Sequence, residues 1–190
     1  MRVILASKSP RRIELLKILL DRFEVVPSDV KESEVYEKEP VKFAKRVALL
    51  KAERVSKGLK GGIVIGADTI VVLNGEILEK PKNREEAISM LFKLSKREHK
   101  VITAIAIVNT ERNEVYIDYE KTLVKMRRID RGEVDSYIKS DEWRDKAGGY
   151  GIQGQAGGFV EYIKGDYFNV VGLPLRRLRR LLYNAGYYRN

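Results

Sequence analysis

The chain contains no cysteine and a single histidine, His99, among its 190 residues. The absence of cysteine excludes a disulfide framework, thiolate zinc sites and cysteine nucleophiles. One histidine cannot build a multi-histidine metal site, and it leaves most histidine-based catalytic triads incomplete. If the chain is an enzyme, its chemistry must therefore use carboxylates, lysines, arginines and hydroxyls, or a metal ion held by oxygen ligands.

Long hydrophobic runs are also absent. No apolar stretch approaches the roughly 18 residues needed to cross a bilayer, and the chain does not open on a basic, then apolar, leader segment. The sequence therefore predicts a soluble, cytoplasmic protein without a membrane partner.

Charge of one sign is in excess. The chain has 37 Lys and Arg residues against 27 Asp and Glu residues, which gives a formal net charge of +10. Such an excess attracts nucleic acid, a membrane surface or phosphorylated small molecules. Many charges of both signs are also typical of a thermophile's surface. Net charge alone therefore leaves the partner open.

The order of apolar segments predicts one mixed α/β domain. A short strand at Val3–Ala6 leads through Ser9 and Pro10 into a helix, and Pro40 begins a second helix that ends near Lys57. A buried strand over Gly62–Leu73 turns back at Asn74 and Gly75. The later elements expected are a strand at Glu76–Glu79, a helix from Asn83 through Leu94, a hairpin of Val101–Val108 and Val115–Met126, a helix from Asp130 through Ser140, strands around Phe159–Ile163 and Tyr167–Val171, and a basic helix from Pro174 to about Asn184.

The end of the first strand carries residues suited to an anion. A strand that runs into a helix N-terminus leaves backbone amides pointing outward, where phosphates bind. Ser7 adds a hydroxyl, and Arg11 and Arg12 add guanidinium groups that oppose the helix dipole. The alternative is an ordinary serine-proline cap with solvated arginines, but the unfavourable placement of two cations favours a phosphate site.

Asp68 and Lys51 are charged residues in apolar surroundings. Asp68 is the only charged residue between Ile63 and Leu73, and burying a carboxylate without a partner costs several kcal/mol, so a metal ion or a cation must compensate. Functional residues in α/β proteins usually lie at strand ends, and Gly66 would allow another backbone to approach closely. Lys51 falls on the apolar face of the second helix. A turn aspartate and a surface lysine are the plain alternatives, but together with the arginines the two residues indicate a polyphosphate site.

Two further charged residues are weaker candidates when taken alone. Lys80 precedes Pro81 just after the hairpin, and its stem could simply lie along the surface. Glu32 lies in a polar segment, where a solvated loop acid is the more common reading.

A glycine-rich segment from Gly148 to Gly158 contains six glycines. Its residues Gly149–Gly154 match the dinucleotide pattern G-x-G-x-x-G, but no strand leads in and no helix follows, so a dinucleotide fold is rejected. Gln153 in this loop suits contact with a flat ligand, because amides read the edges of bases.

The arginine pairs of the last helix favour a solvated face, since no aromatic side chains interleave them. Nucleic acid is therefore not an expected partner.

Five short segments resemble, in the same order, motifs of the Maf family of nucleoside triphosphate pyrophosphatases. They are Leu5–Arg12, Gly66–Thr69, Glu79–Pro81, Lys146–Gly154 and Asn169–Pro174. The resemblance spans nearly the whole chain, so that residues 1–190 would form one such domain. It implies a fold similar to the inosine triphosphate pyrophosphatases, in which helices flank a mixed twisted central sheet and two lobes surround a cleft. It also implies a homodimer.

The resemblance implies hydrolysis of a nucleoside triphosphate to the monophosphate and pyrophosphate with a divalent metal cation, Mg²⁺ or Mn²⁺. By this likeness Asp68 activates water, and Glu32 and Asp68 bind the metal. The residues that would hold phosphates are Ser7, Arg11, Arg12, Lys51 and Lys80. Three residues match the subfamily that hydrolyses dTTP and UTP and would set specificity: Arg12, Thr69 and Gln153. The implied role is house-cleaning of the nucleotide pool.

Two other classes of function stay open. A basic nucleic-acid-binding protein would explain the net charge of +10 but not the carboxylate of Asp68. A non-catalytic regulator, for example of cell division, would use the same site to sense a nucleotide without turnover.

Overall fold

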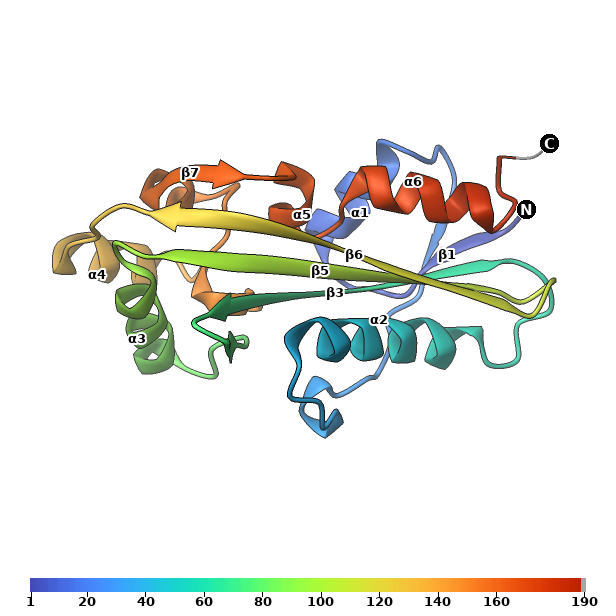
Figure 1. Ribbon diagram of the computed structural model, residues 1–190, viewed down its shortest axis with the longest axis horizontal. Helices are drawn as coiled ribbons and strands as arrows, with labels where there is room; N and C mark the ends of the chain where they lie inside the picture. Colours follow the sequence, from blue (N-terminus) through green and yellow to red (C-terminus); the bar gives the residue numbers. More distant parts are fainter. Residues whose placement is uncertain (189–190) are drawn as a thin grey trace. The chain divides into compact units, whose positions relative to one another are not determined.

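The computed structural model describes residues 1–188, which form a seven-stranded mixed sheet with helices packed on it (Figure 1). The strand order is β2-β1-β3-β5-β6-β7, and β4 pairs with β3 outside this path. β1 (Val3–Leu5) runs parallel to both β2 (Glu24–Val25) and β3 (Ile63–Leu73). A parallel core extended by antiparallel strands confirms the predicted fold class.

The hairpins that the sequence predicts supply the strands β4, β5 and β6. β4 (Glu76–Leu78) pairs with β3 across the expected turn, where Asn74 has a φ of 51° and Gly75 a φ of 87°. β5 (Glu98–Asn109) and β6 (Glu114–Met126) are adjacent in the sheet. β7 (Val160–Lys164) pairs antiparallel with β6.

The chain divides into two compact units. The first comprises Met1–Asp68, Thr103–Glu120 and the chain from Gly172 on, and the second comprises Thr69–Ile102 and Lys121–Val171. β3, β5 and β6 each continue from one unit into the other. That residues 1–190 act as a single domain stays a prediction.

The first unit contains the helices α1 (Pro10–Lys17), α2 (Pro40–Ser56) and α6 (Leu175–Asn184). Figure 1 shows α2 and α6 on opposite sides of this unit's strands. The apolar side chains of α6 are buried, and the Asn109 side-chain amide donates a 2.9 Å hydrogen bond to the carbonyl of Ala185 just after it. Both faces of the strands are thereby covered.

The second unit contains α3 (Arg84–Leu94), α4 (Arg131–Lys139) and the short helices η2 (Ala147–Gly149) and η3 (Gln155–Phe159). Both α-helices begin as their caps predict. The Asn83 side chain accepts the Glu86 amide at 2.8 Å, and Asp130 forms a capping box with Glu133. The core of this unit is built from large side chains on these helices, on the strands and on the segments between them, among them Met126, Tyr137, Trp143, Tyr150 and Phe159.

One predicted strand is wrong. Tyr167–Val171 is not a strand but the helix α5. Its aromatic and β-branched residues favour a strand locally, yet the Asp166 carboxylate accepts the Asn169 amide at 3.2 Å and starts a helical turn. The Asn169 side chain then donates to the Val101 carbonyl at 3.0 Å and to the Thr122 hydroxyl at 2.9 Å. Long-range hydrogen bonds therefore override the local preference.

Within residues 1–188, no helix combines the length and apolar character needed to cross a membrane.

Candidate active site

Asp68 lies in the interior of β3 and is 2% exposed. β3 continues for five residues beyond Asp68, as the strand expected over Gly62–Leu73 does, so Asp68 does not lie at a strand end. Its Oδ1 accepts a hydrogen bond from Lys51 Nζ at 2.8 Å, whereas its Oδ2 is buried and has no hydrogen-bond partner among residues 1–188. Leaving a buried carboxylate oxygen unsatisfied is costly. This oxygen is the natural contact for a water molecule, a substrate or a metal ion.

Lys51 links two carboxylates. Its Nζ lies 2.8 Å from Asp68 Oδ1 and 2.7 Å from Oε1 of Glu32, which begins the short helix η1 (Glu32–Glu34). Lys51 is 8% exposed, in agreement with its place on the apolar face of α2. The structure thus places Glu32, a weak candidate site residue in the sequence, in one ion-paired group with Lys51 and Asp68.

Gly66 allows α2 to bring Lys51 this close to β3. A Cβ at Gly66 would overlap the carbonyl oxygen of Ala48 and lie 2.8 Å from the Ala52 nitrogen. Ala48 lies three residues before Lys51 and four before Ala52, so it is a neighbour of both on the helix surface. Close packing of backbone against backbone therefore places the lysine ammonium at the carboxylate of the strand.

Arg12 and Ser7 form the second part of the site. Arg12 Nε donates to the Gly172 carbonyl at 2.9 Å, and its Nη1 lies 3.4 Å from Ser7 Oγ. Ser7 Oγ also accepts the Ser9 amide at 3.2 Å. Arg11 precedes Arg12 on α1 and is half-buried. Ser9 occupies the N-cap position, as predicted, but its side chain makes no capping hydrogen bond.

Electrostatic effects connect the two parts. Burial raises the pKa of Asp68 above its ordinary value, and the negative charge of Glu32 adds to this effect, whereas Lys51 and Arg12 act against it. Burial lowers the pKa of Arg12, and the charges of Asp68 and Glu32 oppose that shift. A carboxyl with a raised pKa binds a proton more readily than a solvated one, as a general base must.

The remaining predicted residues belong to the second unit. Thr69 follows Asp68 on β3 and is half-buried, whereas Lys80 and Gln153 are exposed. The Gly148 amide donates to the Glu79 carbonyl at 3.1 Å, so the glycine-rich loop is joined to the residue before Lys80. Gly148 has a φ of 68°, a conformation that favours glycine. Lys80 and the loop of Gln153 are therefore neighbouring segments.

Two contacts, one in the site and one in the second unit, have no strong signal in the sequence. The Gly172 carbonyl that holds Arg12 is 160 residues away along the chain, and its only signal is the motif Asn169–Pro174. His99 is 2% exposed, and its Nε2 lies 2.6 Å from the hydroxyl of Tyr150 in the glycine-rich loop.

Asp68 and Glu32 are the residues that could hold a divalent cation. Mg²⁺ is commonly bound by one or two carboxylates together with substrate phosphates. The carboxylates of Asp68 and Glu32 fit this donor set, and both lie within 2.8 Å of Lys51 Nζ. Within residues 1–188 no group of three or more His, Cys, Asp or Glu side chains lies together. The metal site stays a prediction.

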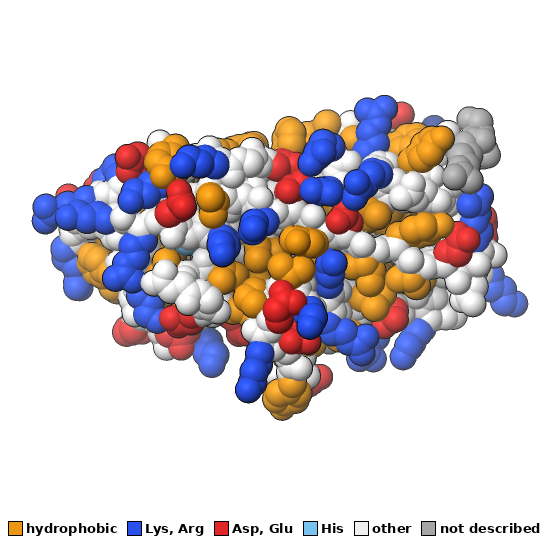
Figure 2. Space-filling view, in the orientation of Figure 1, with side chains coloured by type: hydrophobic (Ala, Val, Ile, Leu, Met, Phe, Trp, Pro, Cys, Tyr) orange, Lys and Arg blue, Asp and Glu red, His pale blue; other side chains and the backbone are white. Residues whose placement is uncertain are grey.

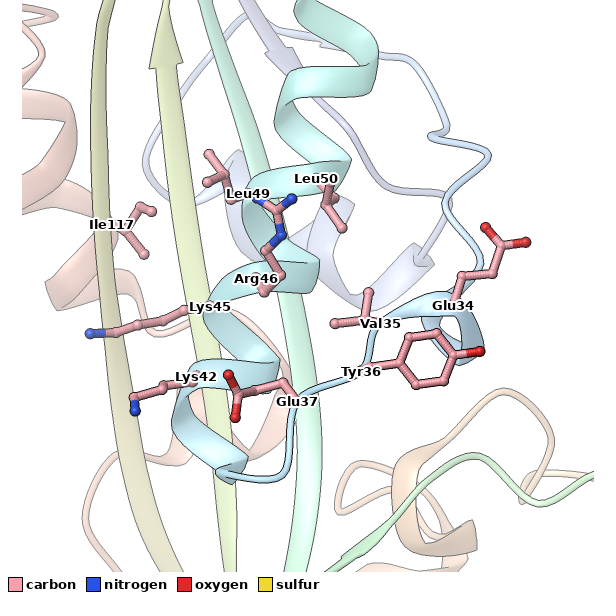
Figure 3. A pocket seen from close by; sticks show the side chains of 10 residues that line it. All are labelled: Glu34, Val35, Tyr36, Glu37, Lys42, Lys45, Arg46, Leu49, Leu50 and Ile117. Carbon is pink, nitrogen blue, oxygen red and sulfur yellow. The ribbon is translucent and has the colours of Figure 1, made fainter.

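A groove of about 610 Å³ is lined mainly by η1 with the chain after it and by α2, the elements that carry Glu32 and Lys51, and also by Ile117 of β6 (Figure 3). One wall is η1 with the chain after it, and the other is the first half of α2. The lining residues are Glu34, Val35, Tyr36, Glu37, Lys42, Lys45, Arg46, Leu49, Leu50 and Ile117. The first wall is acidic, the second is basic, and Tyr36 is 97% exposed.

The arginines of α6 are largely engaged with acids of the same unit. Arg177 contacts Glu120 at 2.8 Å and Asp118 at 3.4 Å, and Arg180 also contacts Asp118. Figure 2 shows Lys and Arg side chains scattered over the visible face with acidic side chains among them. This arrangement agrees with the solvated helix face expected from the sequence.

Comparison with known families matches residues 2–185 to the family described as "Maf-like protein". Curated relatives include the dTTP/UTP pyrophosphatase of Clostridium perfringens, 48% identical over 186 residues that cover 97% of each chain. Another is the dTTP/UTP pyrophosphatase of Dictyoglomus thermophilum, 45% identical over 97% of this chain and 96% of its own.

Similar solved structures are more distant in sequence. A HAM1 protein from Coxiella burnetii is similar with a TM-score of 0.55 at 17% identity, over 97% of this chain and 99% of its own. The Ham1 protein of Staphylococcus aureus gives a TM-score of 0.50 at 20% identity, over 66% of this chain and 72% of its own. At this level of identity the similarity concerns the fold alone, and it agrees with the fold class predicted.

Proposed function

This chain belongs to the Maf-like family, and from that premise we propose that it hydrolyses nucleoside triphosphates, above all dTTP and UTP, to the monophosphate and pyrophosphate. One observation carries the proposal: a buried carboxylate, Asp68, has one oxygen held by Lys51 and the other without a partner among residues 1–188. The choice of nucleotide is supported by the names of the curated relatives, and Arg12, Thr69 and Gln153 are the residues proposed to set it.

The proposed chemical step is attack of water on the α-phosphorus. Lys51 binds Oδ1 of Asp68, so Oδ2 is the oxygen available to accept the proton of the attacking water. The new bond joins the water oxygen to the α-phosphorus, and the bond between the α-phosphorus and the bridging oxygen of pyrophosphate breaks. Asp68 orients this water and takes its proton.

The cationic residues are proposed to bind the phosphates. Ser7 donates from its hydroxyl, and Arg11, Arg12, Lys51 and Lys80 place positive charge where negative charge develops on the leaving pyrophosphate. A divalent cation, Mg²⁺ or Mn²⁺, held by Glu32 and Asp68, would supply further neutralisation of phosphate charge when bound. The proposed role is house-cleaning of the nucleotide pool in the cytoplasm.

Release of pyrophosphate from a panel of nucleotides tests this proposal. Purified protein is given dTTP, UTP, CTP, GTP or ATP with Mg²⁺, with Mn²⁺ or with EDTA. We expect metal-dependent release that is fastest with dTTP and UTP. Fastest release from another nucleotide would refute the specificity and keep the reaction. Binding without any release would indicate the nucleotide sensor, and salt-sensitive binding to DNA or RNA without release would indicate the nucleic-acid-binding protein.

We also propose that the chain forms a homodimer through the groove of Figure 3. A two-fold interface presents the same surface on both copies, so it must be complementary to itself. Here an acidic wall with Glu34 lies opposite a basic wall with Lys42 and Arg46, and two copies related by a two-fold axis could pair acidic wall with basic wall. The exposed ring of Tyr36 would supply apolar contact area.

Sedimentation velocity of the wild type and of two charge-reversal variants tests the interface. We expect the wild type to be a dimer, and Glu34→Lys and Arg46→Glu each to be monomers. An equimolar mixture of the two variants should restore dimers, because each charge then meets its opposite. A monomeric wild type, or a mixture that stays monomeric, would refute the interface.

A further inference from the structure

The loop that carries Gln153 is held on both sides by one short turn. This turn follows α4 and contains Glu142 and Lys146. On the far side of Gln153, Glu142 Oε2 accepts the backbone amide of Gln155 at 3.0 Å. On the near side, the side chain of Lys146 lies against Gly151. Gln153 is exposed between the two contacts.

Two glycines of the loop leave room for these side chains. A Cβ at Gly154 would overlap Glu142 Oε2 and lie 2.8 Å from its Cδ, and a Cβ at Gly151 would lie 2.6 Å from Lys146 Cε. Gly154 has a φ of −104°, which residues with side chains also adopt. A side chain at position 154 would therefore displace the Glu142 carboxylate from its present place, although the backbone conformation itself would accept one.

The turn itself is internally fixed. Lys146 Nζ donates to the backbone carbonyl of Glu142, which ties the two contact residues to each other. The neighbouring Trp143 is buried and donates from its indole nitrogen to the Ile138 carbonyl at 3.1 Å. The turn is thus anchored in the core of the second unit and presents the Glu142 carboxylate to the loop.

We propose that Glu142 is a positioning residue that fixes the backbone beside Gln153 and thereby sets the enzyme's preference among nucleotide bases. This inference rests on the proposed function, in which Gln153 reads the base. An exposed amide side chain discriminates between bases only when its backbone is held in one place, because a mobile loop could turn the amide so that it pairs with either base. The bond from Gln155 N–H to a carboxylate is charge-assisted and therefore stronger than a bond to a neutral acceptor in the same surroundings.

The first test compares selectivity, measured as the ratio of kcat/KM for dTTP to that for CTP. The variants are Glu142→Ala, Glu142→Gln, Gln153→Ala and the double variant Glu142→Ala with Gln153→Ala, and Glu161→Ala on β7 controls for loss of an exposed acid. We expect Glu142→Ala to lower the ratio about tenfold, in keeping with loss of one hydrogen bond to a charged group. Glu142→Gln should keep most of the ratio, because its amide oxygen still accepts the Gln155 amide.

The double variant separates positioning from general stabilisation. If Glu142 acts through Gln153, Glu142→Ala should cause no further loss of selectivity once Gln153 is alanine. Hydrogen exchange supplies a readout independent of turnover: the Gln155 amide should exchange faster in Glu142→Ala than in the wild type, and Glu142→Gln should retain protection.

The outcomes distinguish this inference from the proposed function. If Gln153→Ala lowers the ratio and Glu142→Ala does not, the positioning role is refuted and the proposed function stands. Additive losses in the double variant would likewise refute positioning through Gln153. If Gln153→Ala leaves the ratio unchanged, the role of Gln153 fails, and the positioning role fails with it.

Discussion

Asp68 is retained in the protein interior at an energetic cost. Taking two charges out of water costs several kcal/mol for each ion, and a buried ion pair often recovers no more than this. Lys51 and Asp68 are both at least 90% buried, and one carboxylate oxygen has no partner within the described chain. Apolar residues of similar size would stabilise the fold as well, so the group is better explained by chemistry than by stability.

The first prediction concerns the Asp68 side chain. Asp68→Asn keeps the shape and removes the proton acceptor, so we expect kcat to fall by about 10³-fold, within the range typical of a general base. Nucleotide affinity should change little, because the phosphate-binding cations stay in place. Steady-state kinetics and equilibrium binding measure the two effects, with the exposed Asp21→Asn as control. Unchanged turnover would remove Asp68 from the mechanism.

The second prediction concerns pH. Burial raises the pKa of Asp68, and a base acts only when deprotonated, so kcat/KM should be lost as the pH falls through this raised value. In a plot of kcat/KM against pH, we expect the fall on the acidic side to lie above about pH 4, where an ordinary aspartate titrates. Lys51→Met removes the adjacent positive charge that favours the ionised carboxylate, so the acidic fall of kcat/KM should move to higher pH. An acidic fall at the same pH in both proteins would contradict this electrostatic explanation.

At the scale of elements, the packing of α2 on β3 determines the site. Gly66 has no positive φ that would require glycine, so its role is to let the helix backbone approach the strand. Lys51 lies between the two alanines that occupy this contact. Any outward shift of α2 would therefore separate the lysine ammonium from the carboxylate of the strand.

The third prediction tests this contact. In Gly66→Ala the new methyl group would meet backbone atoms of Ala48 and Ala52, which cannot rotate away. We expect the free energy of unfolding to fall by about 3 kcal/mol and kcat to fall with it, because Lys51 moves with α2. Urea unfolding and pyrophosphate release measure both. Gly158→Ala is the matched control, since nothing lies within 4 Å of a Cβ there. Equal stability of the two variants would contradict the prediction.

At the scale of the whole molecule, the second unit encloses a titratable pair. His99 and Tyr150 are both buried, their rings meet edge to face, and His99 Nδ1 has no hydrogen-bond partner among residues 1–188. Burial lowers the pKa of His99 to about 4. The folded protein therefore holds a neutral histidine at pH values where an unfolded chain would protonate it.

The fourth prediction follows by linkage. Between about pH 6.5 and pH 4 the unfolded state binds a proton at His99 that the folded state does not, so stability decreases as the pH falls through this window. The loss should reach about 3 kcal/mol. Urea unfolding of the wild type and of His99→Gln at several pH values isolates the effect, because the variant cannot titrate there. Parallel curves for the two proteins would refute it.

The sequence by itself determined the local elements and the chemistry of the candidate residues. The caps at Asn83 and Asp130 and the turn at Asn74 form as predicted. These features depend on a few consecutive residues, whose backbone preferences and side-chain hydrogen bonds are set within one turn of chain. A charged residue inside an apolar segment is likewise visible without a structure, which is why Asp68 and Lys51 could be identified.

Tertiary structure alone decided which of these residues meet. Glu32 reads as a loop acid until the fold places it 2.7 Å from Lys51 Nζ. Glu142 has no signal in the sequence until the fold brings it to Gln155. The local sequence of Tyr167–Val171 predicts a strand, but the segment is a helix in which the Asn169 side chain donates to the carbonyl of Val101. Each outcome depends on contacts between segments far apart in the chain, and the free energy of burying or pairing a polar group is set by those contacts, not by its sequence neighbours.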